Sequence, residues 1–152
     1  MNPIKVLREE HEAIEMELGE LDFIMDAGDD MINYPNLVHT FWKVCELWER
    51  HEKMEAEIFE VMKKEGFEIP IDTILLEHKD LRGHVKKIGD AINSGSDARV
   101  RVALVEDVRM FVDVLRKHTE DEEDVLTGVI VSEFSEKGIE EILRIVLMHG
   151  SE

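Results

Sequence analysis

The sequence predicts an all-α protein, an antiparallel up-down four-helix bundle with a short extra C-terminal helix. Two observations predict this fold. Apolar residues recur in steps of three and four along four long stretches, which is the spacing of the inward face of a packed helix. Short segments of turn-forming residues separate these stretches, and short connections between long helices make neighbouring helices antiparallel. The β-branched residues follow the same helical spacing rather than the alternation typical of strands.

Turn-forming residues mark the ends of each predicted helix. Asn2 and Pro3 open the first helix, because proline is tolerated in a first turn. Ser96 or Asp97 is expected to cap the start of the fourth helix. The connections are expected at residues 28–36, around Gly66 to Pro70, and at residues 93–97. The fourth helix should end between residues 128 and 133, so residues 1–130 form the bundle.

A fifth apolar segment is expected from about Gly138 to His149. It is apolar over much of its circumference, and such a surface needs to be covered. Residues 131–152 are therefore expected to pack on the bundle or to lie at a subunit interface, which would make the protein an oligomer.

Six ionisable residues interrupt the four apolar stripes. Protein cores rarely hold ionisable groups unless these groups are paired or bind a metal. Every other residue of the stripes is apolar, so the six stand out as candidate metal ligands. They are His11, His51, Glu55, His78, His118 and Glu122.

The helical hairpins predict that these six residues lie in one layer. Two residues at the same level of an antiparallel hairpin are equally far from the turn. The residue halfway between His11 and His51 is Met31, which lies in the first connection. The corresponding midpoints of the second and third hairpins fall at Gly66 and Arg99, in or next to the other two connections.

The donor set of this layer predicts a site for two metal ions. His51 with Glu55, and His118 with Glu122, share a helix face because they are four residues apart. Each ion could take two imidazoles while the two carboxylates bridge, or each glutamate could serve one ion. Imidazole and carboxylate donors suit iron, manganese or zinc. Two alternatives are a buried imidazolium–carboxylate network without metal, and a single ion with fewer ligands.

Several nearby residues receive lesser roles. Glu10, Glu52 and Glu77 adjoin histidines of the stripes and are either solvated or hydrogen-bonded to an imidazole, and Glu52 is the candidate for an additional ligand. Glu123 lies one step off its stripe, so Glu122 is preferred. The remaining histidines are expected at the surface; they are His39, His84 and His149.

Composition excludes several classes of partner. The formal net charge of −18 argues against binding to nucleic acid or to an anionic membrane surface, which both require basic patches. The single cysteine, Cys45, allows no internal disulfide and no thiolate cluster. The N-terminal residues lack the apolar segment of a signal peptide, and a cytoplasmic location is expected.

The motifs resemble those of the hemerythrin-like, HHE cation-binding family, over about residues 1–130. The matching segments are Leu-Arg-Glu-Glu-His11, His51-Glu-Lys-Met-Glu55, Glu-His78-Lys-Asp-Leu-Arg and His118-Thr-Glu-Asp-Glu122. The resemblance implies a four-helix bundle with a non-haem di-iron centre on these six residues. Its cofactor would be two iron ions with an oxo or hydroxo bridge, zinc and manganese being alternatives. Its partner would be dioxygen, nitric oxide or peroxide.

Two departures bear on function. Oxygen-carrying members have a further histidine four residues after the one in the third helix, and Arg82 stands there. They also place aspartate five residues after the last histidine, where this chain has Glu123. These departures disfavour an oxygen carrier. The sequence predicts a di-iron protein that binds or senses oxygen, nitric oxide or iron, and it is preferred to a dedicated enzyme because no residue clearly supplies a proton to the site. The alternative is a di-iron oxidoreductase that handles peroxide or nitric oxide.

Overall fold

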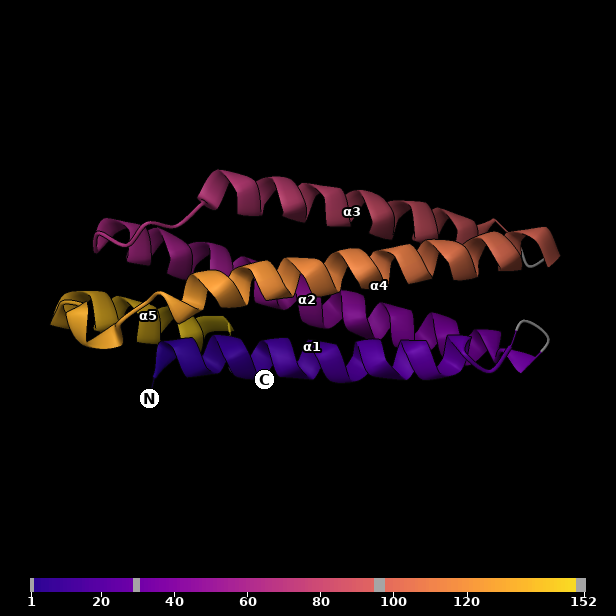
Figure 1. Ribbon diagram of the computed structural model, residues 1–152, viewed down its shortest axis with the longest axis horizontal. Coiled ribbons are helices and arrows are strands. Elements are labelled where there is room, and N and C mark those ends of the chain that lie inside the picture. The colour runs from indigo at the N-terminus through magenta and orange to yellow at the C-terminus, as the bar shows by residue number, and fades with distance from the viewer. Residues whose placement is uncertain (1, 29–30, 95–97, 150–152) are drawn as a thin grey trace.

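Four long helices run side by side in a computed structural model that describes residues 2–28, 31–94 and 98–149, confirming the predicted all-α bundle (Figure 1). The helices are α1 (Pro3–Met25), α2 (Tyr34–Lys64), α3 (Ile71–Asn93), α4 (Ala98–Thr127) and α5 (Glu136–His149), with a 3₁₀ turn, η2 (Val131–Glu133), before α5. Within the described ranges, no helix is both long enough and apolar enough to cross a membrane.

The turn residues act at the helix ends as the sequence predicts. The Asn2 side chain accepts a hydrogen bond from the Ile4 amide at 2.9 Å, and the Asn33 side chain accepts one from the Asn36 amide at 3.1 Å. Gly66 follows α2 with a φ of 97°, which L side chains rarely adopt. Its amide bonds the Lys63 carbonyl, and this αL cap ends the helix. The expected caps Ser96 and Asp97 lie outside the described residues.

The core consists of two apolar clusters with a polar layer between them. One cluster lies toward the α1–α2 connection and includes Phe41 and Phe111, whose rings are 5.4 Å apart. The other lies toward the α2–α3 connection and includes Phe59 and Ile142. The stripes predicted from sequence are buried except for four residues, which are half-buried, and three of these four lie at or near a helix end. These are Val85, Ile92, Val125 and Val129.

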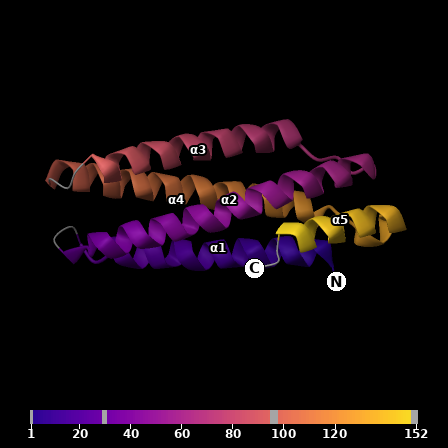
Figure 2. The same ribbon diagram turned by 180° about the vertical axis from the view of Figure 1, so that it is seen from behind.

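Packing between the helices is uneven. α1 packs most extensively along α2, and α3 along α4, so the bundle is a pair of hairpins. α5 packs against α2 and α1 at the end of the bundle where α2 and α3 connect (Figures 1 and 2). This contact covers one face of α5, while Leu147 and Met148 on its other side remain exposed.

Hydrogen bonds to Glu65 hold the start of α5 against the end of α2. Its Oε1 accepts hydrogen bonds from the Ser135 amide at 2.7 Å and from the Ser135 hydroxyl at 2.5 Å. The same hydroxyl accepts a bond from the Gly138 amide at 3.0 Å, so Ser135 caps α5. This cap explains why the helix begins at Glu136, earlier than the sequence predicts. A Cβ atom on Gly138 would lie 1.9 Å from Glu65 Oε1.

We expect Gly138→Ala to weaken the docking of α5. Alanine normally stabilises a helix over glycine by about 0.5–1 kcal/mol, but here the methyl group displaces Glu65 and breaks bonds worth about 1 kcal/mol each. The matched control is Gly19→Ala on the exposed side of α1, where nothing lies within 4 Å of the added carbon. Urea unfolding should place Gly138→Ala about 1–2 kcal/mol below the control. If both substitutions raised the free energy of unfolding equally, the proposed role of Glu65 in docking α5 would be wrong.

Candidate metal centre

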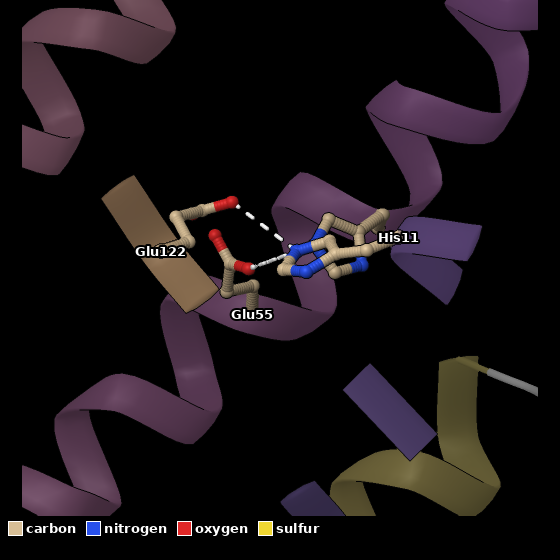
Figure 3. A group of neighbouring side chains, drawn as sticks. His11, Glu55 and Glu122 are labelled. Carbon is tan, nitrogen blue, oxygen red and sulfur yellow. Dashed lines mark hydrogen bonds and ion pairs between the residues drawn. The ribbon is translucent and has the colours of Figure 1, made fainter. Parts of the chain in front are cut away.

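The structure brings all six predicted residues into one buried layer between the two apolar clusters. His11 comes from α1, His51 and Glu55 from α2, His78 from α3, and His118 and Glu122 from α4. Their exposed fractions lie between 0% and 6%. Figure 3 shows His11 facing Glu55 and Glu122 across the bundle. The hairpin argument thus located the layer correctly.

The six residues form two overlapping groups. The first contains His11 and His51, the second His78 and His118, and both include Glu55 and Glu122. Within each group one ligand atom per residue lies within 4.8 Å of all the others. His11 Nε2 is 3.4 Å from Glu55 Oε2 and 3.3 Å from Glu122 Oε1. On the other side, His78 Nε2 is 3.7 Å from Glu55 Oε1 and 3.8 Å from Glu122 Oε2.

Several of these buried atoms have no hydrogen-bond partner. They are Glu55 Oε1, both oxygens of Glu122, both ring nitrogens of His78, and His118 Nε2. An unsatisfied buried polar group costs about 1–3 kcal/mol, and more if it is charged. A cation within the layer would satisfy these oxygens and nitrogens together. The unsatisfied atoms therefore fit a metal site better than a closed polar network.

The Nε2 atoms of two imidazoles also point toward each other. His11 Nε2 and His51 Nε2 are 2.9 Å apart, while the Nδ1 atom of each ring bonds a different carboxylate. If both Nδ1 atoms carry the proton, both Nε2 atoms present lone pairs, and these repel each other unless a proton or a cation lies between them. Two nitrogens bound to one ion at roughly 2.1 Å and at right angles would be about 3 Å apart.

Charges within the layer strongly shift the pKa values of two of its side chains. Burial alone would lower the pKa of His51, but the charge of Glu55 and hydrogen bonds to Glu10 and Glu55 raise it to about 10. Burial alone would raise the pKa of Glu55, but the charge of His51 and bonds from the surrounding imidazoles hold it well below its usual value. Burial lowers the pKa of His118. His51 and Glu55 therefore form an ion pair within the layer, with 2.7 Å between Nε2 and Oε2.

Outer carboxylates orient three of the four imidazoles. His51 Nδ1 donates to Glu10 at 2.6 Å, and His118 Nδ1 donates to Glu77 at 2.6 Å. His11 Nδ1 donates to Glu123 at 2.7 Å. A carboxylate on Nδ1 fixes the ring and makes Nε2 a better ligand. Each carboxylate belongs to a neighbouring helix, so Glu10 and Glu77 serve histidines on the next helix rather than those beside them in sequence.

Sequence reasoning did not identify the hydrogen-bond partners of Glu123 and Glu52. Glu123 was set aside as off the stripe, yet that offset places it at the rim, where it reaches His11 on α1. Glu52 was the candidate for an additional ligand, but it belongs to neither ligand group. It lies 3.4 Å from His78 Nδ1 and bonds Arg82 instead. Adjacency to the six residues was the only signal, and it does not say which neighbouring helix a side chain reaches.

The remaining candidate residues lie away from the layer or are unreactive. His39 is exposed and His149 pairs with Glu57. His84 is half-buried, and its Nε2 lies 4.0 Å from Asp80 Oδ2. Burial raises the pKa of the Cys45 thiol to about 12, which makes it a poor nucleophile at neutral pH.

Two cavities flank the layer in the grooves between the hairpins. The α1–α4 cavity measures about 590 Å³ and reaches His11 among mostly acidic residues, including Glu12, Glu120 and Glu123. The α2–α3 cavity measures about 530 Å³ and has a more apolar wall that includes Trp48 and Val85.

Comparison with known proteins agrees with this geometry. Residues 2–130 match the family model described as the hemerythrin HHE cation binding domain. No curated protein and no solved structure matches the chain. The matched residues include all four bundle helices and both groups of side chains that could hold a metal ion. The chain belongs to the hemerythrin HHE cation-binding family.

Proposed function

We propose that this protein is a non-haem di-iron protein that binds dioxygen or nitric oxide at its buried layer. The observation that carries the proposal is the pair of overlapping groups that share Glu55 and Glu122. Each group offers two imidazoles and two carboxylates. The two shared carboxylates each have one oxygen toward either half, as expected of residues that bridge two ions.

The donor chemistry supports iron as the metal. Calcium and magnesium prefer sites made of oxygen alone, and thiolate donors are absent from both groups. Mixed imidazole and carboxylate donors suit iron, with manganese and zinc as competitors. Inward carboxylates and histidines of helical bundles commonly hold di-iron centres. Four protein ligands for each ion would leave coordination positions free for a small ligand. Iron bound there would supply Lewis acidity and one-electron redox chemistry toward a small ligand.

The protein's own residues have a separate task, which is to orient the imidazoles and exclude water. Glu10, Glu77 and Glu123 fix three rings through Nδ1. The apolar clusters on either side keep the layer dry, which strengthens every charge interaction within it. A dry, ordered site of this kind is suited to binding a small neutral ligand such as dioxygen.

Binding is favoured over a dedicated oxidoreductase. Tyr34 lies near the start of α2 beneath the Arg101 guanidinium, at the far end of the first apolar cluster. Because the pKa of Cys45 is raised, its thiol holds the proton tightly. The thiol is therefore a poor proton donor to a ligand, and little of it is present as the thiolate that a nucleophilic attack needs. Neither side chain is thus suited to deliver protons to the layer, which peroxide reduction requires.

Metal content tests the proposal directly. We expect protein loaded with iron to hold about two ions per chain, one for each group. His118→Ala removes a ligand of the second group, so it should lower iron affinity more than about tenfold. Elemental analysis and near-ultraviolet absorption measure both quantities.

The matched control is His84→Ala, which removes a half-buried histidine outside the layer. It should bind iron as the unmodified chain does. A folded protein that takes up no metal would sink the proposal, and equal loss of iron in both variants would show that the ligands are misassigned.

Metal binding should release a proton from His51. With a pKa of about 10, this imidazole is protonated at neutral pH in metal-free protein, and a metal needs its neutral form. Affinity should therefore rise with pH by about tenfold per unit below pH 10 for one released proton. Calorimetry in buffers of different ionisation enthalpy counts the protons. The release should disappear above pH 10, and its absence at pH 7 would contradict the raised pKa.

Ligand binding can be separated from turnover. We expect the reduced, iron-loaded protein to change its visible absorption on exposure to dioxygen or nitric oxide, and to recover when the gas is removed. Stopped-flow absorption measures both steps. Rapid, irreversible oxidation by dioxygen with no recovery, together with no response to nitric oxide, would reject binding of these gases as the function.

A further inference from the structure

The two hairpins supply equivalent parts of the layer. His51 on α2 and His118 on α4 occupy equivalent places, each four residues before a shared glutamate. Their outer carboxylates, Glu10 and Glu77, bond Nδ1 at the same distance, 2.6 Å, and are equally exposed, at 28%. This half of the arrangement is symmetric within the precision of the distances.

The other two histidines break the symmetry. Each is approached by a carboxylate that also faces an arginine: Glu123 lies between His11 and Arg8, and Glu52 lies between His78 and Arg82. Glu123 uses one oxygen for each neighbour, with 2.7 Å from Oε1 to His11 Nδ1 and 3.1 Å from Oε2 to Arg8 Nε. Both of its contacts are therefore good hydrogen bonds.

Glu52 offers the same oxygen to both neighbours. Arg82 donates to Oε1, and His78 Nδ1 is left 3.4 Å from that atom without a hydrogen-bond partner. His78 is 1% exposed, so water does not readily replace the missing partner. Of the four imidazoles in the layer, His78 alone lacks an oriented Nδ1.

The sequence explains the difference. Glu52 follows His51 directly, but the residue that follows His118 is Thr119, and the corresponding carboxylate of α4 stands one turn later, at Glu123. A shift of one helical turn is about 5.4 Å, so the two carboxylates approach their facing histidines from different levels. Arg8 takes the second oxygen of Glu123, whereas Arg82 takes the Glu52 oxygen that lies toward the histidine. Arg82 stands one turn after His78 on the same face of α3, where it reaches Glu52.

The α2–α3 cavity lies on the same side. Glu52, Arg82 and Trp48 are part of its wall. Trp48 lies edge-on to His78 with 6.2 Å between ring centroids, and its buried Nε1 has no hydrogen-bond partner. The α2–α3 cavity thus approaches the imidazole with the unsupported Nδ1 through Trp48, Glu52 and Arg82, whereas the α1–α4 cavity touches His11 directly.

We propose that Arg82 is a positioning residue that draws Glu52 away from His78 and so makes the His78–His118 position the more readily exchanged of the two ion positions. The inference rests on the proposed function, because it assumes that both groups hold an ion. Loss of an outer carboxylate on a ligand histidine commonly lowers metal affinity 10- to 100-fold. The His11–His51 position keeps both of its outer carboxylates and is the tighter one.

Chelator competition tests this asymmetry. Iron should leave the loaded protein in two phases of similar amplitude, with the fast phase about tenfold or more above the slow one. Arg82→Ala frees Glu52 to accept the His78 Nδ1 proton, and the fast phase should slow by about tenfold. Arg82→Lys, which keeps a cation for Glu52, should keep the fast phase. Adding Glu52→Gln to Arg82→Ala should restore it, which a general change in stability would not do.

Arg8→Ala is the matched control, because Glu123 already bonds His11 through a separate oxygen. It should slow neither phase. A second readout uses metal-free protein: in Arg82→Ala, nitrogen-15 correlation spectra should show the His78 Nδ1 proton shifted downfield as it bonds Glu52.

The outcomes distinguish the inference from the proposed function. Two ions that leave in a single phase, or equal effects of the two arginine variants, would overturn the asymmetry and leave the di-iron proposal standing. No bound metal at all would overturn the proposed function and the exchange asymmetry with it. An unshifted His78 proton in metal-free Arg82→Ala would reject the positioning role of Arg82 on its own.

Discussion

The burial of two carboxylates, Glu55 and Glu122, at the centre of the bundle constrains the rest of the structure. Their exposed fractions are 0% and 1%, and an unpaired buried carboxylate costs several kcal/mol. Imidazoles from four helices surround them, so no helix can slide without breaking the layer. A slip of one turn would move a histidine by about 5.4 Å, beyond the reach of both carboxylates. The polar layer therefore fixes the register that the apolar clusters alone would leave loose.

Exposure to water increases outward from this centre in steps. The shared carboxylates lie in the middle, the imidazoles surround them, and the carboxylates of Glu10, Glu77 and Glu123 lie at the rim, partly in water. Rim carboxylates need less compensation because water still solvates them, and through Nδ1 they raise the basicity of the buried rings. Part of the net charge of −18 thus serves the layer, although most acidic residues lie on the solvated surface.

The two sides of the layer face different surroundings. The α1–α4 groove is lined mostly by acidic residues, whereas the α2–α3 groove combines Trp48 and Val85 with charged residues of both signs. The six central residues are nearly symmetric, so the difference between the two groups of candidate ligands lies at the rim. Under the proposed function, small changes at rim positions such as Arg82 would therefore alter ion exchange at one group without touching any residue of the central layer.

The sequence by itself determined the bundle, most of the described helix ends and the level of the six-residue layer, but not the start of α5. These follow from local rules: periodicity, capping, and equal distances from a turn. Only the tertiary structure decided the hydrogen-bond partners. Glu10 reaches His51 rather than the adjacent His11, Glu123 supports His11, and Arg82 takes the Glu52 oxygen that faces His78. Spacing along one helix gives the level and face of a side chain, but the choice among neighbours across a groove depends on side-chain reach and on competition between donors. These are set only when the helices pack.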